Sequence, residues 1–334
     1  KCVAIENDFK EKYRDKTGTK RNIGKYSKDE FINLLKNSGI TGLGGSDFPT
    51  FLKYNTKLKY LLVNGVESEP YVSCDKVIMS NYTEEILECI DKMVDILELK
   101  KAYLVVKEDN IEIIDKVREY IGTYPNVEIY IMPNSYISGW ERNIIKKVLK
   151  LKYNKYPSEI GVVVQNVSTI YAIYEMLKYN RPLTERIITI MGNGVKKEVN
   201  VKVKIGALIS EIIENIGGYK DIKNPILIAG GLLRGNSLPT DELLVTKDLN
   251  CVIVDSYTKE ISYPCINCGK CSNICPVNLI PVFIMQNYNN KEKLKYLKPN
   301  KCIECGLCSY ICPSKIELMK YVKMSKDVNN NEEI

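Results

Sequence analysis

The sequence predicts an α/β domain with a largely parallel sheet, followed by a small β-grasp unit and a helical, cysteine-rich domain. Three observations predict this division. Apolar strand patterns alternate with amphipathic helical patterns over residues 60–180, as they do in βαβ units. A strand–turn–strand–helix pattern then occupies residues 187–216. Two matched groups of cysteines follow between residues 265 and 312.

The elements of the first domain follow from local signals. A capping box at residues 27–30 begins the first predicted helix, and Asn37, Ser38 and Gly39 end it. A glycine-rich loop, residues 42–50, separates this helix from the first buried strand. The predicted strands are residues 60–63, 102–106, 127–132 and 161–165. The predicted helices that alternate with them are residues 83–97, 111–121 and 168–180.

The next part of the chain has a different pattern. Residues 187–191 and 199–205 predict two strands joined by a Gly-Asn-Gly turn, and residues 207–216 predict a helix that ends at two glycines. This order is typical of a ubiquitin-like β-grasp unit. Further strands are predicted at residues 226–229 and 251–254, and a helical linker at residues 279–298 joins the cysteine groups.

Composition narrows the possible chemistry. The 334 residues suggest two or three domains, and no apolar run is long enough to span a membrane. The net charge of +7 is spread along the chain and forms no basic stripe, so we expect no nucleic-acid partner. There is no histidine, which excludes Ser-His-Asp hydrolysis and histidine-ligated metal sites. Chemistry that a bound cofactor performs is therefore favoured.

Eight cysteines form two copies of the pattern C-x2-C-x2-C-x3-C-P. This is the spacing of bacterial ferredoxins with two [4Fe–4S] clusters, in which the last cysteine of each group binds the other cluster. One predicted set of ligands is Cys265, Cys268, Cys271 and Cys312. The other predicted set is Cys302, Cys305, Cys308 and Cys275.

Two other interpretations of the cysteines are weaker. Disulfides require an oxidising compartment, and nothing in the sequence marks the chain as secreted. Zinc sites usually pair two C-x2-C units across a longer spacer. Because clusters of this kind are oxygen-sensitive, we expect an anaerobic, cytoplasmic setting.

Three segments, in the same order as the cysteine groups, resemble one family. They read GLGGSDFPTFLK at residues 42–53, VNGVESEPY at residues 63–71 and GVVVQNVST at residues 161–169. The family is RnfC, the soluble NADH-side subunit of Rnf electron-transport complexes, which is similar to the FMN-binding, NADH-side subunit of complex I. The proline-reductase-associated electron transfer protein is a related branch that this sequence does not separate from it. The resemblance implies a complex I flavin-subunit-like α/β fold, an SLBB-like β-grasp unit and a ferredoxin-type domain with two [4Fe–4S] clusters.

The resemblance also implies a cofactor site. In the relatives the glycine loop holds FMN and leaves room for NADH above it. By that match Gly42, Gly44 and Gly45 shape the loop, and Lys53 is placed for the FMN phosphate.

Two further motifs add residues to this implied site. Asn64, Glu67 and Glu69 match the segment that hydrogen-bonds the isoalloxazine or the nicotinamide ribose. Asn166 and Thr169 match residues that hold the flavin phosphate and ribityl chain near a helix N-terminus.

The implied function is that of an oxidoreductase subunit passing electrons between NADH, through FMN, and two [4Fe–4S] clusters. Its partner would be a redox protein: the Rnf membrane subunits, ferredoxin or a soluble reductase. Asp47 and Val66 stand where relatives have a small and an acidic residue, which favours an alternative. That alternative is an adaptor with a degenerate nucleotide site, serving a soluble reductase such as proline reductase. A scaffolding module with purely structural clusters is the third hypothesis.

We expect the protein to be in the cytoplasm or on the cytoplasmic face of a membrane complex. We also expect the chain to divide into six segments. The expected segments are a remnant of a truncated N-terminal barrel domain at 1–26, the FMN/NADH-binding-like domain at 27–182, the β-grasp domain at 183–222, a connecting segment at 223–258, the two-cluster domain at 259–323 and a disordered tail at 324–334.

Overall fold

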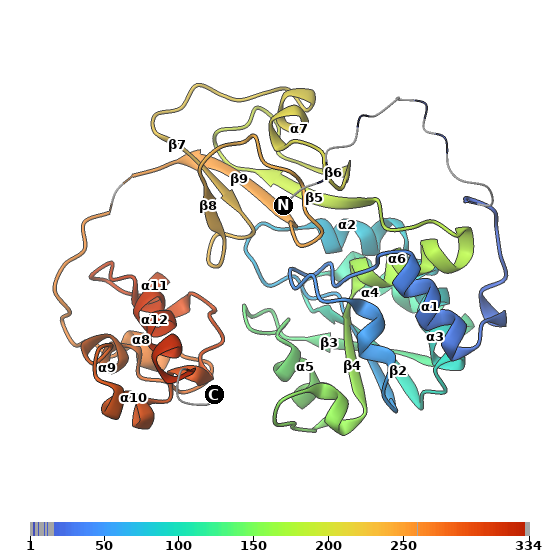
Figure 1. Ribbon diagram of the computed structural model, residues 1–334, viewed down its shortest axis with the longest axis horizontal. Coiled ribbons are helices and arrows are strands. Elements are labelled where there is room, and N and C mark those ends of the chain that lie inside the picture. The colour runs from blue at the N-terminus through green and yellow to red at the C-terminus, as the bar shows by residue number, and fades with distance from the viewer. Residues whose placement is uncertain are drawn as a thin grey trace.

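The computed structural model describes residues 17–258 and 260–330, together with residues 3, 6, 10 and 12. Its elements are labelled in Figure 1. The strands are β1 Tyr60–Asn64, β2 Lys101–Lys107, β3 Val127–Met132, β4 Val162–Asn166, β5 Glu185–Met191, β6 Val199–Lys204, β7 Pro225–Ala229, β8 Asn236–Leu238 and β9 Cys251–Ser256. The helices are α1 Lys28–Asn37, α2 Cys74–Asn81, α3 Thr83–Ile96, α4 Ile111–Tyr120, α5 Glu141–Leu149, α6 Val167–Tyr179, α7 Ile209–Asn215, α8 Lys270–Asn273, α9 Pro281–Gln286, α10 Lys291–Leu297, α11 Leu307–Tyr310 and α12 Leu318–Asn330.

The first sheet is fully parallel and has the strand order β3-β2-β1-β4. The chain moves outward from β1 to β2 and β3, then returns to place β4 on the other side of β1. The order therefore reverses between β1 and β4, and in open α/β sheets the crevice at such a point is where ligands bind. The predicted α/β domain with a parallel sheet is confirmed.

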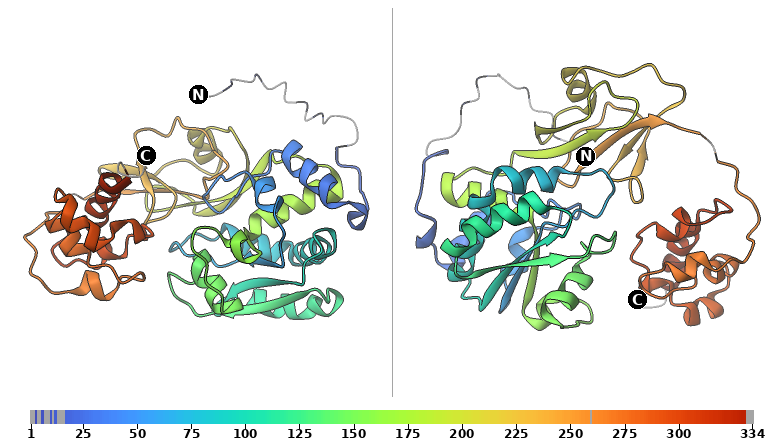
Figure 2. Two further views of the ribbon diagram at one scale, coloured as in Figure 1. Left: turned by 60° about the horizontal axis from the view of Figure 1, so that its bottom comes forward. Right: turned by 180° about the vertical axis from the view of Figure 1, so that it is seen from behind.

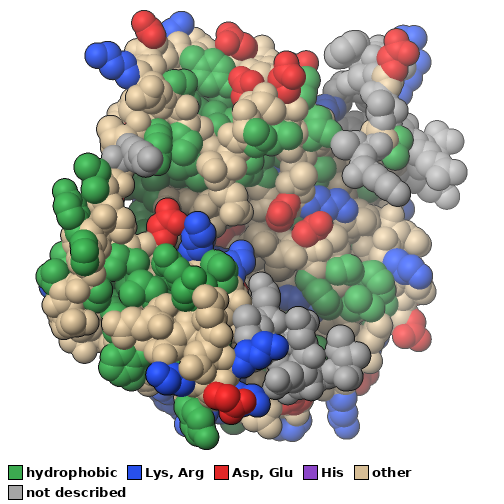
Figure 3. All heavy atoms as spheres, turned by 60° about the vertical axis from the view of Figure 1, so that its left-hand side comes forward, with side chains coloured by type: hydrophobic (Ala, Val, Ile, Leu, Met, Phe, Trp, Pro, Cys, Tyr) green, Lys and Arg blue, Asp and Glu red, His purple; other side chains and the backbone are tan. Residues whose placement is uncertain are grey.

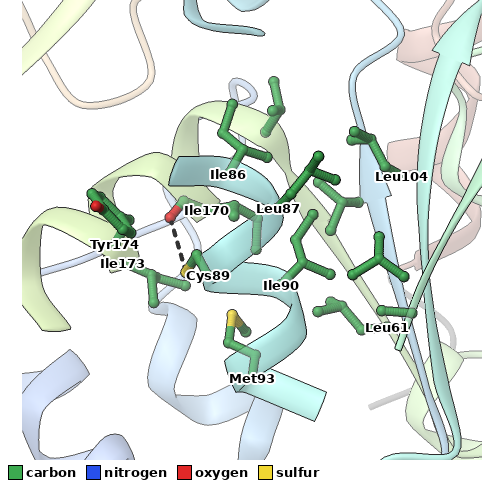
Figure 4. Close-up of a cluster of buried hydrophobic side chains, with 14 of the residues drawn as sticks. Leu61, Ile86, Leu87, Cys89, Ile90, Met93, Leu104, Ile170, Ile173 and Tyr174 are labelled. Atoms are coloured by element: carbon green, nitrogen blue, oxygen red, sulfur yellow. Dashed lines mark hydrogen bonds between the residues drawn. The ribbon is translucent and has the colours of Figure 1, made fainter. Parts of the chain in front are cut away.

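Helices cover both faces of this sheet, which explains why its strands are apolar almost throughout. On one face α3, α4 and α6 pack against Leu61 and Leu104. In Figure 4, Ile90 of α3 points toward Leu61, and the Cys89 thiol donates a hydrogen bond of 3.5 Å to the Ile170 carbonyl of α6. On the other face α5 supplies Ile144 and Ile145, which share a cluster with strand residues such as Leu62.

The second sheet has the order β6-β5-β9-β7-β8. β5 pairs antiparallel with β6 and parallel with β9, and α7 packs its buried isoleucines against this sheet. Residues 223–258 were expected to be a connecting segment with strands at 226–229 and 251–254, but they supply three of the five strands of this sheet. The correction has a physical reason, because a two-stranded hairpin alone leaves its edges unpaired and is barely stable in water. The assignment of this unit as SLBB-like stays a prediction.

The C-terminal domain, residues 260–330, gathers helices α8 to α12 around the two cysteine groups (Figures 1 and 2). The expected disordered tail from residue 324 is wrong as far as residue 330, because α12 continues to Asn330 and buries Val322 and Ser325 against the domain. Residues 331–334 and twelve of the 26 residues of the predicted barrel remnant lie outside the described residues. None of the described helices has the length and apolar character needed to cross a membrane.

Candidate functional site

The first candidate site lies at the carboxyl end of the parallel sheet, where the strand order reverses. Asn64 ends β1 and Asn166 ends β4, and the two residues are partners in the strand register. The glycine loop packs directly against them: a Cβ built on Gly44 would lie 3.1 Å from Cβ of Asn166. Gly44 is therefore needed for this close approach of the loop to the sheet.

The backbone of the glycine loop is fixed by side chains from other elements. The Leu43 N–H donates to Oγ1 of Thr169, at 3.0 Å, in a buried hydrogen bond. The Leu43 carbonyl accepts from the buried Arg186 guanidinium of β5. Arg186 of the second sheet and Thr169 of α6 thus both fix the backbone of Leu43 in the loop.

Asp47 completes the turn of this loop. It adopts a left-handed φ of 45°, and its N–H donates to the Gly42 carbonyl at 3.1 Å. Its side chain is exposed. The following 3-10 helix, Thr50–Tyr54, begins after Pro49 and has no side-chain cap, so Asp47 does not cap it.

Lys53 leaves that short helix and reaches β4, where its Nζ donates to the Val164 carbonyl at 2.9 Å. Burial lowers the pKa of this ammonium group, and the carboxylate of Glu141 acts in the opposite direction. A poorly hydrated cation suits an anionic ligand such as a phosphate.

Asn64 connects β1 to the loop of Gly139 and Trp140, which belongs to none of the three sequence motifs. Its Nδ2 donates to the Gly139 carbonyl at 2.9 Å, and its Oδ1 accepts from the Val66 N–H at 3.0 Å. The adjacent Trp140 has a buried Nε1 with no hydrogen-bond partner among the described residues. This loop adds an unused donor to the site.

A buried polar network links the site to the start of α2. Asn166 caps α6 by accepting from the Ser168 N–H at 2.8 Å, and its Nδ2 donates to the Asp75 carboxylate at 2.7 Å. The Ser168 hydroxyl also donates to Asp75. Burial raises the pKa of Asp75, while these two hydrogen bonds oppose the rise. Neither Asp75 nor Ser168 is identified from the sequence; the available signal is an acidic residue in the first turn of a buried helix.

Glu67 and Glu69 face a second region. Glu67 accepts from the N–H groups of Asp75 and Lys76, at 3.0 and 3.2 Å, at the start of α2. Glu69 accepts from the Tyr136 hydroxyl at 2.9 Å and from the Leu233 N–H at 3.1 Å. Both glutamates line a cavity of about 390 Å³ beside β2, which no residue of the glycine loop lines.

The nine residues implied in cofactor binding therefore divide between two regions. The glutamates line the β2 cavity, and Asn64 ends the strand between the regions. The residues gathered at the β1–β4 crevice are Gly42, Gly44, Gly45, Lys53, Asn166 and Thr169.

Glu67 should make stability depend on pH. Burial and the nearby Asp75 raise its pKa from about 4.5 to about 7. At pH values between the unfolded-state pKa and the folded-state pKa of Glu67, the folded chain therefore binds more protons than the unfolded chain. The contribution of Glu67 to stability is complete below the unfolded-state pKa and is lost as pH rises through the folded-state pKa. We expect the free energy of unfolding to fall by about 1–2 kcal/mol between about pH 5.5 and about pH 8. In Glu67→Gln this slope should disappear; urea unfolding across this pH range that gave equal slopes for both proteins would contradict the assignment.

The second candidate site is the pair of cysteine groups. Each group begins a short helix at a glycine, Gly269 before α8 and Gly306 before α11. The thiols of Cys265, Cys268, Cys271 and Cys312 line one cavity of about 330 Å³. The thiols of Cys275, Cys302, Cys305 and Cys308 line another, of about 20 Å³. In both cavities the last cysteine of one group lies with three of the other.

The donor sets fit iron–sulfur clusters better than zinc or disulfides. All eight cysteines are free thiols. Among the described residues, no three Cys, Asp or Glu side chains converge closely enough to share one metal ion. A cubane cluster holds its four thiolates farther apart, since each binds a different iron. The N–H groups of Asn267 and Glu304 donate to the sulfurs of Cys265 and Cys302, at 3.4 and 3.3 Å, and such bonds tune cluster potentials.

Two family models match the two parts of the chain that carry these candidate sites. Residues 35–175 match the family model described as the Nuo51 FMN-binding domain, and residues 264–316 match the 4Fe-4S dicluster domain. The RnfC subunit of the ion-translocating oxidoreductase complex of Haemophilus influenzae is 34% identical over 264 residues, 76% of this chain and 32% of that protein. Its counterpart in Vibrio cholerae is 31% identical over 289 residues, 84% of this chain and 37% of that protein.

The resemblance to the RnfC family is confirmed. The chain spans about a third of the length of the RnfC relatives it matches. The fold is also that of a chain of NAD+-reducing [NiFe]-hydrogenase. The air-oxidized structure has a TM-score of 0.60 at 16% identity, covering 91% of this chain and 54% of that one. The H2-reduced structure has the same TM-score at 14% identity, covering 92% and 61%.

Proposed function

We propose that this RnfC relative is an electron-transfer flavoprotein that passes electrons between NADH and a partner redox protein. FMN is held at the β1–β4 crevice, and two [4Fe–4S] clusters are held by the eight cysteines. One observation carries the proposal. Gly44 of the glycine loop packs against Asn166, the N-cap of α6, and Lys53 donates to Val164 of β4, beside the point where the strand order reverses. The same chain carries two cavities lined by four cysteines each.

The residues at the crevice suit a flavin phosphate and ring. The N-terminus of α6, with its backbone N–H groups, and the Lys53 ammonium bind the phosphate. Gly44 brings the loop backbone close to Asn166, and the Trp140 Nε1 offers a buried donor. When bound, FMN supplies the means to convert the two electrons of the NADH hydride into single electrons, because each cluster accepts only one. With FMN and both clusters bound, the oxidation of one NADH would supply two electrons, one for each cluster, and would release one proton.

The partner is a redox protein: a subunit of a membrane complex, ferredoxin or a soluble reductase. The relatives are named as subunits of an ion-translocating complex, which supports a place in such a complex. The cavity of Cys265, Cys268, Cys271 and Cys312 lies toward the surface, and Cys268 is exposed. Electrons leave or enter the chain at this cavity.

The visible spectrum of the anaerobically reconstituted protein tests this function. Protein reconstituted with iron, sulfide and FMN should show a shoulder near 400 nm from the clusters and a flavin band, and NADH should bleach both. Clusters without retained flavin would contradict the proposal and support an adaptor with a degenerate nucleotide site. Retained flavin that NADH does not bleach would remove NADH as the substrate.

Asp47 should slow the reaction with NADH, because its carboxylate adds negative charge to the loop that faces an anionic dinucleotide. Asp47→Asn removes the charge, and Asn tolerates the left-handed φ of 45°. Since the side chain is exposed and screened by salt, we expect cluster reduction by NADH to become faster by at most about tenfold. Stopped-flow rates at low ionic strength measure this effect. Asp115→Asn, a change at an exposed carboxylate on α4, is the control, and equal rates in all three proteins would refute the repulsion.

A further inference from the structure

The loop between β7 and β8, residues 230–235, lies between the α/β domain and the C-terminal domain. In Figures 1 and 2 the tip of this hairpin points into the space between them. On the α/β side, the Leu233 N–H donates to the Glu69 carboxylate at 3.1 Å. Gly231 packs so closely on Glu69 that a Cβ would overlap the Glu69 side chain. Glu69 in turn accepts from Tyr136, so the loop is anchored to the edge of the candidate flavin domain.

Arg234 of the same loop makes a second contact with that domain. Its guanidinium lies 5.1 Å from the centre of the Trp140 ring. Trp140 follows Gly139, whose carbonyl accepts from Asn64 at the end of β1. The ring therefore connects Arg234 to the strand that ends at the β1–β4 crevice.

On its other side the loop contacts the second cysteine group. The Leu233 carbonyl packs against Gly306, the residue between Cys305 and α11, where a Cβ would overlap it. Arg234 directly follows Leu233, so this contact places the Arg234 backbone beside the second cysteine group. Cys305 lines the smaller cavity, with Cys275, Cys302 and Cys308.

The larger cavity has an exposed, partly apolar rim. Its rim includes Ile266 and Phe283, which are 66% and 49% exposed. Figure 3 turns the left-hand side of Figure 1, with the C-terminal domain, toward the viewer and shows hydrophobic side chains gathered on this face. The two cavities thus differ in their surroundings: one meets the hairpin loop and the other meets the surface.

We propose that the cluster of Cys275, Cys302, Cys305 and Cys308 is the one nearest the flavin domain, because the 230–235 loop connects the two. Arg234 of this loop is a positioning residue that raises the reduction potential of that cluster. The assignment rests on the proposed function. A cluster gains negative charge when it is reduced, so a nearby permanent cation favours the reduced state. The cation–π contact with Trp140 holds the guanidinium in place. Because Arg234 is exposed, its effect weakens as salt is added.

Redox titration of the reconstituted protein, followed by electron paramagnetic resonance, tests the charge. In Arg234→Gln one cluster should shift to a more negative midpoint potential, and the shift should shrink at high salt. The shifted signal should be the one that Cys305→Ser alters and Cys268→Ser does not. Arg234→Lys should keep most of the wild-type potential. A shift of the other cluster, equal shifts of both, or no shift would overturn the proposal.

The matched control is Arg142→Gln. Arg142 is also exposed, lies 4.1 Å from the Tyr153 ring and donates to the carbonyls of Tyr153 and Asn154. It makes no contact with the 230–235 loop in the described part of the chain. Its replacement should leave both midpoint potentials unchanged.

A second measurement needs no cofactor. Trp140 is the only tryptophan of the chain, so its fluorescence reports the Arg234 contact directly. In cluster-free, flavin-free protein, Arg234→Gln should change the emission of Trp140, and Arg142→Gln should not. Unchanged emission in Arg234→Gln would show that the contact is not made in solution. This readout stands even where the chain fails to retain FMN, so failure of this inference and failure of the proposed function are distinguishable.

Discussion

Cys312→Ser is expected to remove the cluster of Cys265, Cys268 and Cys271 and to leave the cluster of its own sequence neighbours in place. The reason is that the Cys312 thiol lines the larger cavity, whereas Cys302, Cys305 and Cys308 line the smaller one with Cys275. A four-iron cluster that loses a thiolate ligand is exposed to solvent and to loss of iron. Iron and sulfide content should fall by about half, and resonance spectra should retain one signal.

The reciprocal variant, Cys275→Ser, is the control for this crossover. It should remove the other cluster and preserve the one that Cys312→Ser destroys. The two variants should therefore retain different signals, whose midpoint potentials together account for the wild-type titration. Loss of the Cys302, Cys305 and Cys308 cluster in Cys312→Ser would mean that each group binds its own cluster without crossover.

Lys53→Ala is expected to weaken FMN binding by about tenfold to a hundredfold and to leave iron content unchanged. A charged hydrogen bond to a phosphate contributes about 1–3 kcal/mol, and the half-buried Lys53 has few competing waters. The dissociation constant is measured by quenching of FMN fluorescence with cluster-free protein. Lys53→Arg should retain part of the affinity because it keeps the charge.

Lys57→Ala controls for the general loss of a cation, because Lys57 is exposed and lies four residues farther along the chain. Thermal unfolding of each variant separates weaker binding from a loss of fold, since Lys53 also donates to the Val164 carbonyl of β4. Equal FMN affinity in Lys53→Ala and wild type would place the phosphate elsewhere.

Elements whose signals are local could be predicted from the sequence. Helices α1, α3, α4 and α6 and the strands of the first sheet follow from apolar periodicity and caps, and the capping box at Ser27 and Glu30 is present as expected. Helices α2 and α5 were not predicted. The two cysteine groups follow from spacing alone. The glycine loop and the end of β4 were assigned to one site by the resemblance to the RnfC family, not by spacing or periodicity.

The parts that sequence alone could not give depend on partners far apart in the chain. Asp75 meets Asn166 and Ser168 across more than 90 residues, and a single acidic residue in a helix carries no information about such a partner. The strands after residue 223 were separated from the β-grasp unit because pairing of β9 with β5 joins segments about 60 residues apart. Helix α12 extends past residue 324 because its apolar face meets the domain, which outweighs its polar, asparagine-rich composition.

The close packing of Gly231 on Glu69 has an evolutionary consequence. A side chain at residue 231 would overlap the glutamate that also bonds Tyr136 and Leu233, so neither position is free to change by itself. Related sequences that carry a larger residue at the first position should carry a shorter one at the second. Residues 231 and 69 are therefore expected to covary among related proteins. In relatives where both are replaced, the contact between the 230–235 loop and the α/β domain should differ.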